Sequence, residues 1–275
     1  MIEAAVLLAA VGAADLARAP VRHRLWSAVL GALVGVGVAG AGALLAGAAD
    51  WMPYAAALLL ALWMWAMTPE AGDEPERIWP GLVVLVAAAI AAVALPESGE
   101  PDPLVATWYA ATAPGAAGIA WTTSLVTLGV VLFLLRSTNL LVRAAINSRA
   151  AARGSSTPPT SARRALPSGA EGWRVRIGRR PIADVERVAA VGRAAPQLVG
   201  GRVIGPIERL LLIGLGLAGG AAVIAALVAA KGVVRFPEIS ADRGTGANAE
   251  TFLVGSLTSW AVAAGGALLI WGTLG

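Results

Sequence analysis

The sequence of 275 residues contains no cysteine and one histidine, His23. The lack of cysteine excludes disulfide bonds and any metal, redox or nucleophilic chemistry that needs a thiol. One histidine excludes metal sites built from several imidazoles and disfavours a Ser–His–Asp triad. His23 also lies between two arginines, whose charge disfavours its protonated form, and has no acid beside it in the sequence. We therefore expect no metal and no cofactor, and the sequence indicates no catalytic residue.

Charged residues are scarce as well. They make up 14% of the chain, against 57% apolar residues, whereas a soluble protein carries about 25% charged residues. Several apolar runs approach the roughly 20 residues that a helix needs to cross a bilayer. These runs are continuous rather than alternating, which favours helices over a β-barrel. The predicted fold class is all-α, a polytopic transmembrane helical bundle of six or seven membrane helices with a basic cytoplasmic loop region.

The apolar runs define seven predicted membrane segments. The first is short for a full crossing, and the second contains the pair Gly31 and Gly35, a spacing typical of closely packed membrane helices. We therefore expect the second segment to be the central packing helix. A weaker apolar stretch, residues 104–113, suits a helix at the membrane interface. The seven segments are residues 4–17, 26–48, 53–67, 80–95, 118–135, 210–230 and 251–274.

The sixth segment has the clearest predicted boundaries. Pro206 fits the first helical position, and Glu208 in the first turn suits the positive end of the helix dipole. Lys231 and Arg235 follow the apolar run, and Pro237 is expected to end the helix. The pattern predicts one continuous membrane-crossing helix.

Charge divides the chain into three predicted domains: 1–135, 136–205 and 206–275. The middle region holds thirteen arginines and three acids, so it is expected on the cytoplasmic side of a bacterial cell membrane. With seven crossings the N-terminus lies outside and the C-terminus inside; with six the N-terminus also lies inside. Within this region, residues 173–177 alternate as in a strand, and residues 182–198 suit a short amphipathic helix.

The expected partners follow from the same arginines. They suit the lipid bilayer, with anionic headgroups at its surface, or a protein partner. A homo-oligomer is a further possibility. The arginine-rich region has a single aromatic residue, Trp173, for base stacking, which argues against nucleic acid.

Three groups of charged residues are candidate sites. Lys231, Arg235, Glu238 and Glu250 form either an ion-pair network or the polar mouth of a site for an anionic ligand; the alternative is that the two cations only anchor a helix end.

Glu208 and Arg209 form either a polar gate or a pair that compensates the helix dipole and orients the chain. Glu3 and Asp15, near opposite ends of the first segment, are possible functional acids, with Arg18 a partner for Asp15.

The C-terminal part resembles a group of uncharacterised bacterial polytopic membrane proteins. The shared patterns are G-x-x-I-G-x-x-E-R, A-A-K-x-x-x-R-F-x-E, and an acid before G-[ST]-x-x-S. An N-terminal H-x-x-x-D-F pattern of that group, similar to one in membrane-bound metal-dependent hydrolases, is reduced here to Asp15, with Val11 and Leu16 at the other positions. The residues that carry the C-terminal patterns are Gly201, Ile204, Gly205, Glu208, Arg209, Ala229, Ala230, Lys231, Arg235, Phe236, Glu238, Glu250, Gly255, Ser256 and Ser259.

Three functions remain open on this evidence. The first is a non-enzymatic membrane protein that binds or moves a small solute or ion. The second is a structural or regulatory subunit whose arginine-rich region docks a protein partner or anionic lipid. The third, which the sequence favours least, is a degenerate membrane-bound hydrolase.

Overall fold

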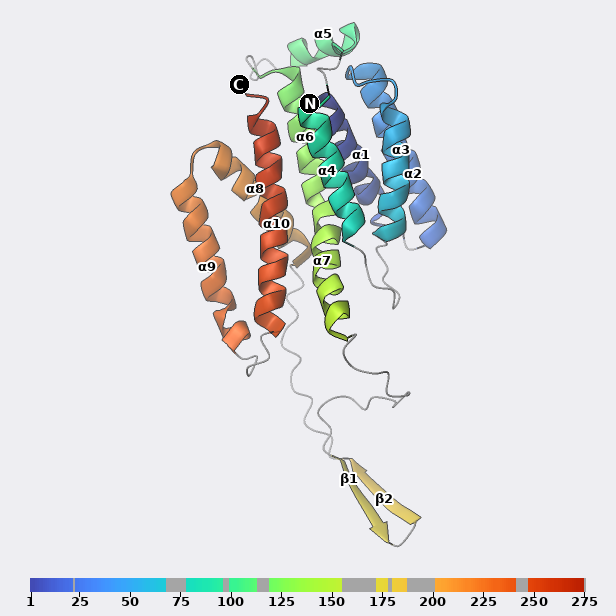
Figure 1. Ribbon diagram of the computed structural model, residues 1–275, viewed down its shortest axis with the longest axis vertical. Coiled ribbons are helices and arrows are strands. Elements are labelled where there is room, and N and C mark those ends of the chain that lie inside the picture. The colour runs from blue at the N-terminus through green and yellow to red at the C-terminus, as the bar shows by residue number, and fades with distance from the viewer. Residues whose placement is uncertain are drawn as a thin grey trace.

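The computed structural model describes residues 1–21, 23–67, 78–95, 99–112, 119–154, 172–177, 180–186, 201–240 and 247–274. Within these ranges it contains ten helices and one antiparallel β-hairpin, and the helices form the predicted bundle (Figure 1). The elements are α1 (Ile2–Arg18), α2 (Arg24–Leu45), α3 (Met52–Ala66), α4 (Trp79–Val93), α5 (Pro103–Thr112), α6 (Trp121–Leu135), α7 (Ser137–Gly154), β1 (Gly172–Ile177), β2 (Arg180–Glu186), α8 (Gly201–Leu217), α9 (Ala221–Ser240) and α10 (Ala247–Trp271).

Helix α1 is the centre of the bundle. It packs against α2, α3, α4 and α6, and nearly all of its residues are buried. The prediction that the glycine-rich second segment would be the central helix is wrong. Helix α1 is apolar on every side and built mainly from alanine, valine and leucine, so neighbours can surround it. Helix α2 instead leaves large side chains such as Leu33 and Leu44 exposed.

The crossing of α1 and α6 depends on one glycine from each helix. A Cβ atom on Gly12 would lie 2.5 Å from the backbone carbonyl carbon of Leu132, and one on Gly129 would lie 2.4 Å from the backbone oxygen of Ala5. The two backbones therefore touch where a side chain would separate them. Close backbone approach of this kind is how helices associate when no water is present to drive them together.

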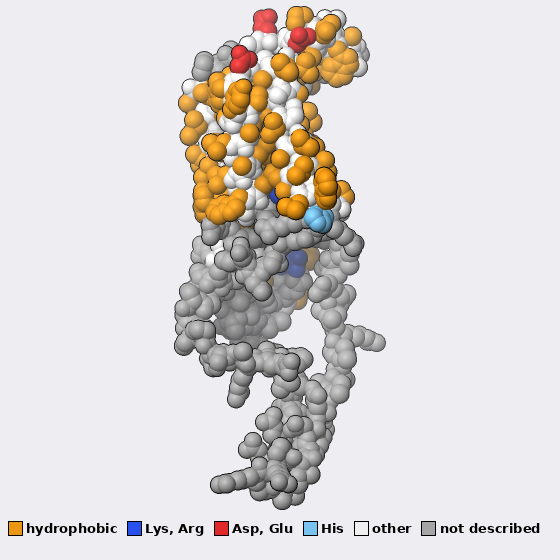
Figure 2. Space-filling model, turned by 90° about the vertical axis from the view of Figure 1, so that its right-hand side faces the viewer, with side chains coloured by type: hydrophobic (Ala, Val, Ile, Leu, Met, Phe, Trp, Pro, Cys, Tyr) orange, Lys and Arg blue, Asp and Glu red, His pale blue; other side chains and the backbone are white. Residues whose placement is uncertain are grey.

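Two helices are long and apolar enough to cross a membrane, namely residues Leu25–Leu45 and Ala249–Trp271. The pair α6–α7, bent by 46° at its break, would make a third. Helices α3 and α4 are apolar but shorter. In Figure 2 hydrophobic side chains cover one face of the bundle in a continuous band, with acidic side chains only at one end of it. These features indicate a membrane-associated helical bundle.

The sixth predicted segment is not one helix. It breaks after Leu217 into α8 and α9, which form a hairpin (Figure 1). Gly219 has φ +73°, and the backbone N–H of Gly220 donates to the carbonyl of Leu215 at 2.7 Å, so the first helix ends in a Schellman motif. The prediction of a single crossing is wrong because the run of glycines supplies a residue that adopts the left-handed conformation at little cost.

The two prolines expected to limit this segment lie inside its helices. Pro206 lies within α8, which begins at Gly201, and Pro237 lies within the last turn of α9, which continues to Ser240. The missing proline N–H removes only one hydrogen bond, which a helix near its end tolerates.

Both chain termini lie at the same end of the bundle (Figure 1). A Cβ atom on Gly272 would lie 3.1 Å from the Cε atom of Met1, and the hydroxyl of Thr123 donates to the carbonyl of Thr273 at 3.1 Å. The sequence predicted that seven crossings would separate the termini. The α8–α9 hairpin changes this, because it returns the chain to its starting end. The acidic loop at residues 69–77 lies outside the described residues.

The arginine-rich region contributes the β-hairpin. Residues 173–177 lie in strand β1, as predicted, and β1 pairs with β2 through Trp173 opposite Val185. The helix predicted at residues 182–198 is wrong at its start, because residues up to Glu186 belong to β2. Residues 187–198 lie outside the described part of the chain. The all-α fold class thus carries one β-hairpin.

Candidate functional site: a basic pocket between α7 and α10

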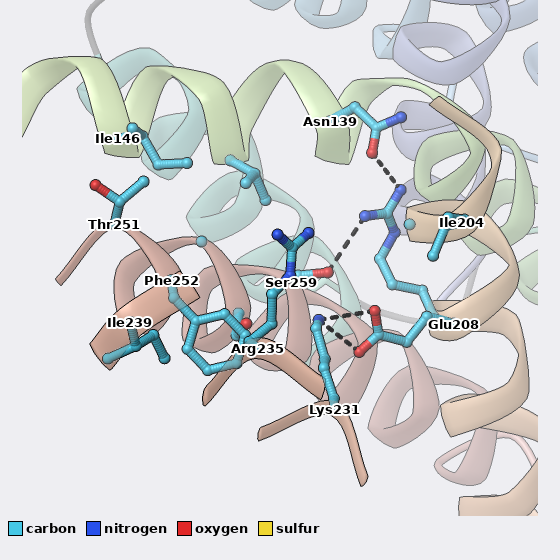
Figure 3. Close-up of a pocket in the computed structure, with 15 residues that line it drawn as sticks. Asn139, Ile146, Ile204, Glu208, Lys231, Arg235, Ile239, Thr251, Phe252 and Ser259 are labelled. Carbon is cyan, nitrogen blue, oxygen red and sulfur yellow. Dashed lines mark hydrogen bonds and ion pairs between the residues drawn. The ribbon is translucent and has the colours of Figure 1, made fainter. Parts of the chain in front are cut away.

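A cavity of about 870 Å³ lies between α7, α8, α9 and α10 (Figure 3). Three cations and one carboxylate line it, which gives the wall a net charge of +2. The other lining residues are small, hydroxylic or apolar. The residues that line the cavity are Asn139, Val142, Ile146, Ile204, Gly205, Glu208, Arg209, Lys231, Arg235, Ile239, Thr251, Phe252, Gly255, Ser256 and Ser259.

Arg209 is the most deeply placed cation of the pocket, with 1% of its surface exposed. Its Nη1 donates to the hydroxyl of Ser259 at 3.2 Å, and its Nη2 donates to the carbonyl of Leu134 and the Oδ1 of Asn139, both at 2.7 Å. Its Nε is buried without a hydrogen-bond partner. Among the described residues no carboxylate lies within 4.0 Å of its guanidinium. The structure therefore buries a positive charge against neutral partners.

The break between α6 and α7 supplies one of these acceptors. Arg136 at the break has φ −135° and ψ −47°, which interrupts the helical hydrogen bonds. The hydroxyl of Thr138 donates to the carbonyl of Phe133, and Arg209 donates to the carbonyl of Leu134. Carbonyls at a helix end need such partners when they are buried. The bend therefore both exposes backbone oxygens and holds Arg209 in position.

Lys231 and Glu208 form an ion pair across the α8–α9 hairpin. The Nζ of Lys231 lies 2.8 Å from both carboxylate oxygens of Glu208, as the dashed lines in Figure 3 show. The indole N–H of Trp260 on α10 donates to the same carboxylate at 2.9 Å, and its ring lies 5.3 Å from the Lys231 Nζ. This cluster fastens the hairpin to α10, and the Glu208 carboxylate forms its direct bonds with Lys231 and Trp260 rather than with the neighbouring Arg209.

Four of the predicted site residues line the same pocket, namely Glu208, Arg209, Lys231 and Arg235. The partners differ from the expected ones, because Lys231 binds Glu208 on α8. Glu250 lies in the first turn of α10, beside Thr251 of the wall. Glu238 lies on α9, and its side chain is outside the described part of the structure.

Asp15 and Arg18 lie in a second buried cluster, away from the pocket. Arg18 Nη2 is 2.5 Å from Asp15 Oδ1, and the side chains are 3% and 0% exposed. Asp15 also accepts hydrogen bonds from the indole of Trp63 and the hydroxyl of Ser137, and Arg18 donates to the carbonyl of Met67. This network joins the ends of α1 and α3 to the start of α7, and a structural role explains it, although the Nε of Arg18 has no hydrogen-bond partner.

Glu3, at the other end of α1, is buried beside the chain terminus. One of its carboxylate oxygens lies 3.7 Å from the N-terminal ammonium group. The two acids of α1 therefore occupy separate environments, and the structure does not bring them together into one site.

Sequence reasoning missed three groups that hold the charged residues of the pocket in place. They are the side chains of Asn139 and Trp260 and the backbone carbonyl of Leu134. The signal for Asn139 was its place in the short polar stretch 136–139 that follows a long apolar run. The indole of Trp260 lies in an otherwise apolar part of α10. No pattern in the sequence marks the carbonyl of Leu134, because it becomes available only through the bend.

The patterns behind the family resemblance converge on the pocket. Of the first pattern, Ile204, Gly205, Glu208 and Arg209 line it, and the later patterns add Lys231, Arg235, Gly255, Ser256 and Ser259. Comparisons of the chain with protein-family models, curated proteins and solved structures find no match. Among the described residues no three His, Cys, Asp or Glu side chains lie together as metal ligands would.

Proposed function

We propose that this protein is a multi-pass membrane protein that binds a small anionic solute in the pocket between α7 and α10. The buried guanidinium of Arg209 carries the proposal. Removing a charge from water costs several kcal/mol unless an opposite charge compensates it. Neutral oxygens offset part of this cost, and an anion in the adjoining cavity would offset the rest.

The depth of the pocket supports this proposal. If Trp271 marks one membrane interface, as aromatic residues commonly do, Phe252 lies about 28 Å away along α10, near the other interface. Ser259, which contacts Arg209, then lies about 10 Å inside that second interface by the same helical rise. The pocket would therefore open at the membrane surface and end at a cation inside the bilayer region, as a solute site requires.

The remaining topology is part of the same proposal. Helices α1 to α4, the bent pair α6–α7 and α10 would cross the membrane of a bacterial cell, and α8–α9 would enter it from one side. Of the region 136–205 that the sequence assigns to the cytoplasm, α7 would lie in the membrane, and the arginine-rich part that follows α7 would lie in the cytoplasm. Under this arrangement the end of α9 that carries Arg235 would face the cytoplasmic side, whereas a single sixth crossing would have placed it outside. Lys231 would lie deeper, beside Trp260.

Anion-induced stabilisation tests the proposal directly. The purified protein in nanodiscs is heated with and without acetate or inorganic phosphate, because a ligand that binds only the folded state raises the melting temperature. We expect an increase that Arg209→Gln abolishes and Arg209→Lys retains in part. Arg143→Gln, a change of the same charge on α7 outside the pocket lining, is the matched control. Equal stabilisation of all variants would disprove the site.

Transport is tested separately from binding. In proteoliposomes we expect Lys231→Ala and Glu250→Ala to abolish anion flux without lowering expression. Binding without flux would indicate a receptor or sensor rather than a carrier. The alternative role, docking of a protein partner or anionic lipid by the arginine-rich region, predicts instead that deletion of residues 149–200 removes the phenotype while both point variants keep it.

A further inference from the structure

The distribution of polar and apolar side chains in the pocket wall indicates more about the ligand than its charge. The polar groups gather at one end of the cavity, where Asn139, Ser259 and the Glu208–Lys231 pair lie together (Figure 3). Large apolar side chains lie toward the other end, where Ile146, Phe252 and Ile239 are found in the same view, beside Thr251 and Arg235. The pocket therefore has a deep polar end at Arg209 and a second end where most of the large apolar side chains lie.

The volume of the cavity favours an organic anion over an inorganic one. A cavity of about 870 Å³ falls within the range of roughly 300–1,000 Å³ typical of sites for drug-sized organic molecules. An inorganic anion would leave most of this space and all of the apolar wall unused. Burial of apolar surface is favourable in proportion to its area, so a ligand with an apolar body would gain affinity from that wall.

The order of the two ends indicates how such a ligand lies. Along α7, Asn139 precedes Ile146 by seven residues, about 10 Å, and Ile146 is nearer the end of α7 that continues into the arginine-rich region. The charged end is therefore the deeper one. A bilayer lipid would place its charged headgroup and its chain in the opposite order, so the geometry disfavours a membrane lipid as the occupant.

We propose that the ligand is an organic carboxylate with an apolar body, and that it enters from the end of the bundle that carries the arginine-rich region. Its carboxylate meets Arg209 at the deep end, and its apolar body lies against Ile146, Ile239 and Phe252. This inference rests on the proposed function, since it names the class of anion that the same pocket takes.

A series of straight-chain carboxylates tests the inference. Acetate, butyrate and hexanoate are titrated into the nanodisc protein by calorimetry, with inorganic phosphate as a second probe. Burial of one methylene is worth about fourfold in affinity, so we expect affinity to rise steeply from acetate to hexanoate. Phosphate should bind no more tightly than acetate.

Variants of the apolar wall separate specific binding from partition into the bilayer. Ile146→Ala and Phe252→Ala should flatten the rise with chain length, measured for each variant relative to its own acetate affinity. Leu253→Ala is the matched control, because Leu253 is adjacent to Phe252, 53% exposed and outside the pocket lining. It should retain the full rise.

The possible outcomes distinguish this inference from the proposed function. If anions bind in an Arg209-dependent way but chain length has no effect, the anion site stands and the organic carboxylate is wrong. If the rise persists in Ile146→Ala and Phe252→Ala, the apolar body binds elsewhere and the inference is again wrong. If no anion binding depends on Arg209, the proposed function itself fails.

Discussion

Two arginines of this protein, Arg18 and Arg209, are both buried but have different kinds of partners. Arg18 lies 2.5 Å from a carboxylate oxygen of Asp15, and the pair is completed by Trp63 and Ser137. Arg209 is equally buried but contacts only neutral oxygens among the described residues. Since a buried charge requires compensation, the first arginine has a carboxylate partner within the protein, and the proposed anion would supply one to the second.

The first prediction concerns the paired arginine. Asp15→Ala leaves the Arg18 guanidinium buried without its carboxylate, and loss of one partner of a buried ion pair costs about 3–5 kcal/mol. We expect a correspondingly large decrease in unfolding free energy, measured by denaturation in detergent. Asp50→Ala, at an exposed position, should change it by less than about 0.5 kcal/mol. Equal effects of the two substitutions would show that the Asp15 network does not hold the bundle together.

At the scale of helices, contacts between backbones determine the packing of α1. Gly12 and Gly129 allow α1 and α6 to touch, and the side chain of Leu60 occupies the space beside Gly35 of α2. By contrast, Gly37 of α2 has open space where its Cβ would lie. The sequence shows both kinds of glycine in the same way, so only the packing tells which of them matter.

The second prediction compares these glycines. Gly12→Ala places a methyl group against the backbone of α6, so α1 and α6 must move apart. We expect the free energy of unfolding to fall by about 1–3 kcal/mol. Gly37→Ala meets nothing and should stabilise its helix by about 0.5–1 kcal/mol, because alanine has the higher helix propensity. Thermal unfolding of both variants in the same detergent measures the difference. A Gly12→Ala variant as stable as Gly37→Ala would mean that the α1–α6 contact is looser than described.

For the whole molecule, the α8–α9 hairpin decides the topology. A single crossing would have put Lys231 and Arg235 on the side of the acidic loops, against the usual distribution of positive charge. The hairpin instead turns the C-terminal end of α9, which follows Arg235, toward the end of the bundle opposite the two termini (Figure 1). Lys231 in the middle of α9 faces Glu208 and Trp260. The same turn forms one side of the basic pocket, so the topology and the candidate site depend on the same break in the chain.

The third prediction tests this topology. The chain has no cysteine, so single cysteines can be introduced and labelled with a membrane-impermeant reagent. Glu100→Cys and Leu274→Cys should react from the outer side of the membrane. Ser240→Cys should react only from the cytoplasmic side. Labelling of Ser240→Cys from the outer side, with Leu274→Cys reactive only from the cytoplasmic side, would restore the single sixth crossing and remove the pocket.

By itself, the sequence determined that the protein is a helical bundle suited to a membrane, because long uncharged runs must satisfy their backbone groups within helices. It also singled out Glu208, Arg209, Lys231 and Arg235, because charged residues beside apolar runs are rare. It could not show that Lys231 pairs with Glu208, twenty-three positions earlier in the chain. Nor could it show that Asn139 and Ser259 meet at Arg209.

Only the tertiary structure decided which buried charges have an ion-pair partner, as Arg18 has, and which contact neutral oxygens, as Arg209 does. That depends on the turn at Gly219 and the bend after Leu135, where a single backbone conformation redirects a whole helix. Local sequence permits such turns without requiring them. The choice is made by packing between segments distant in the chain, whose contacts no local pattern records.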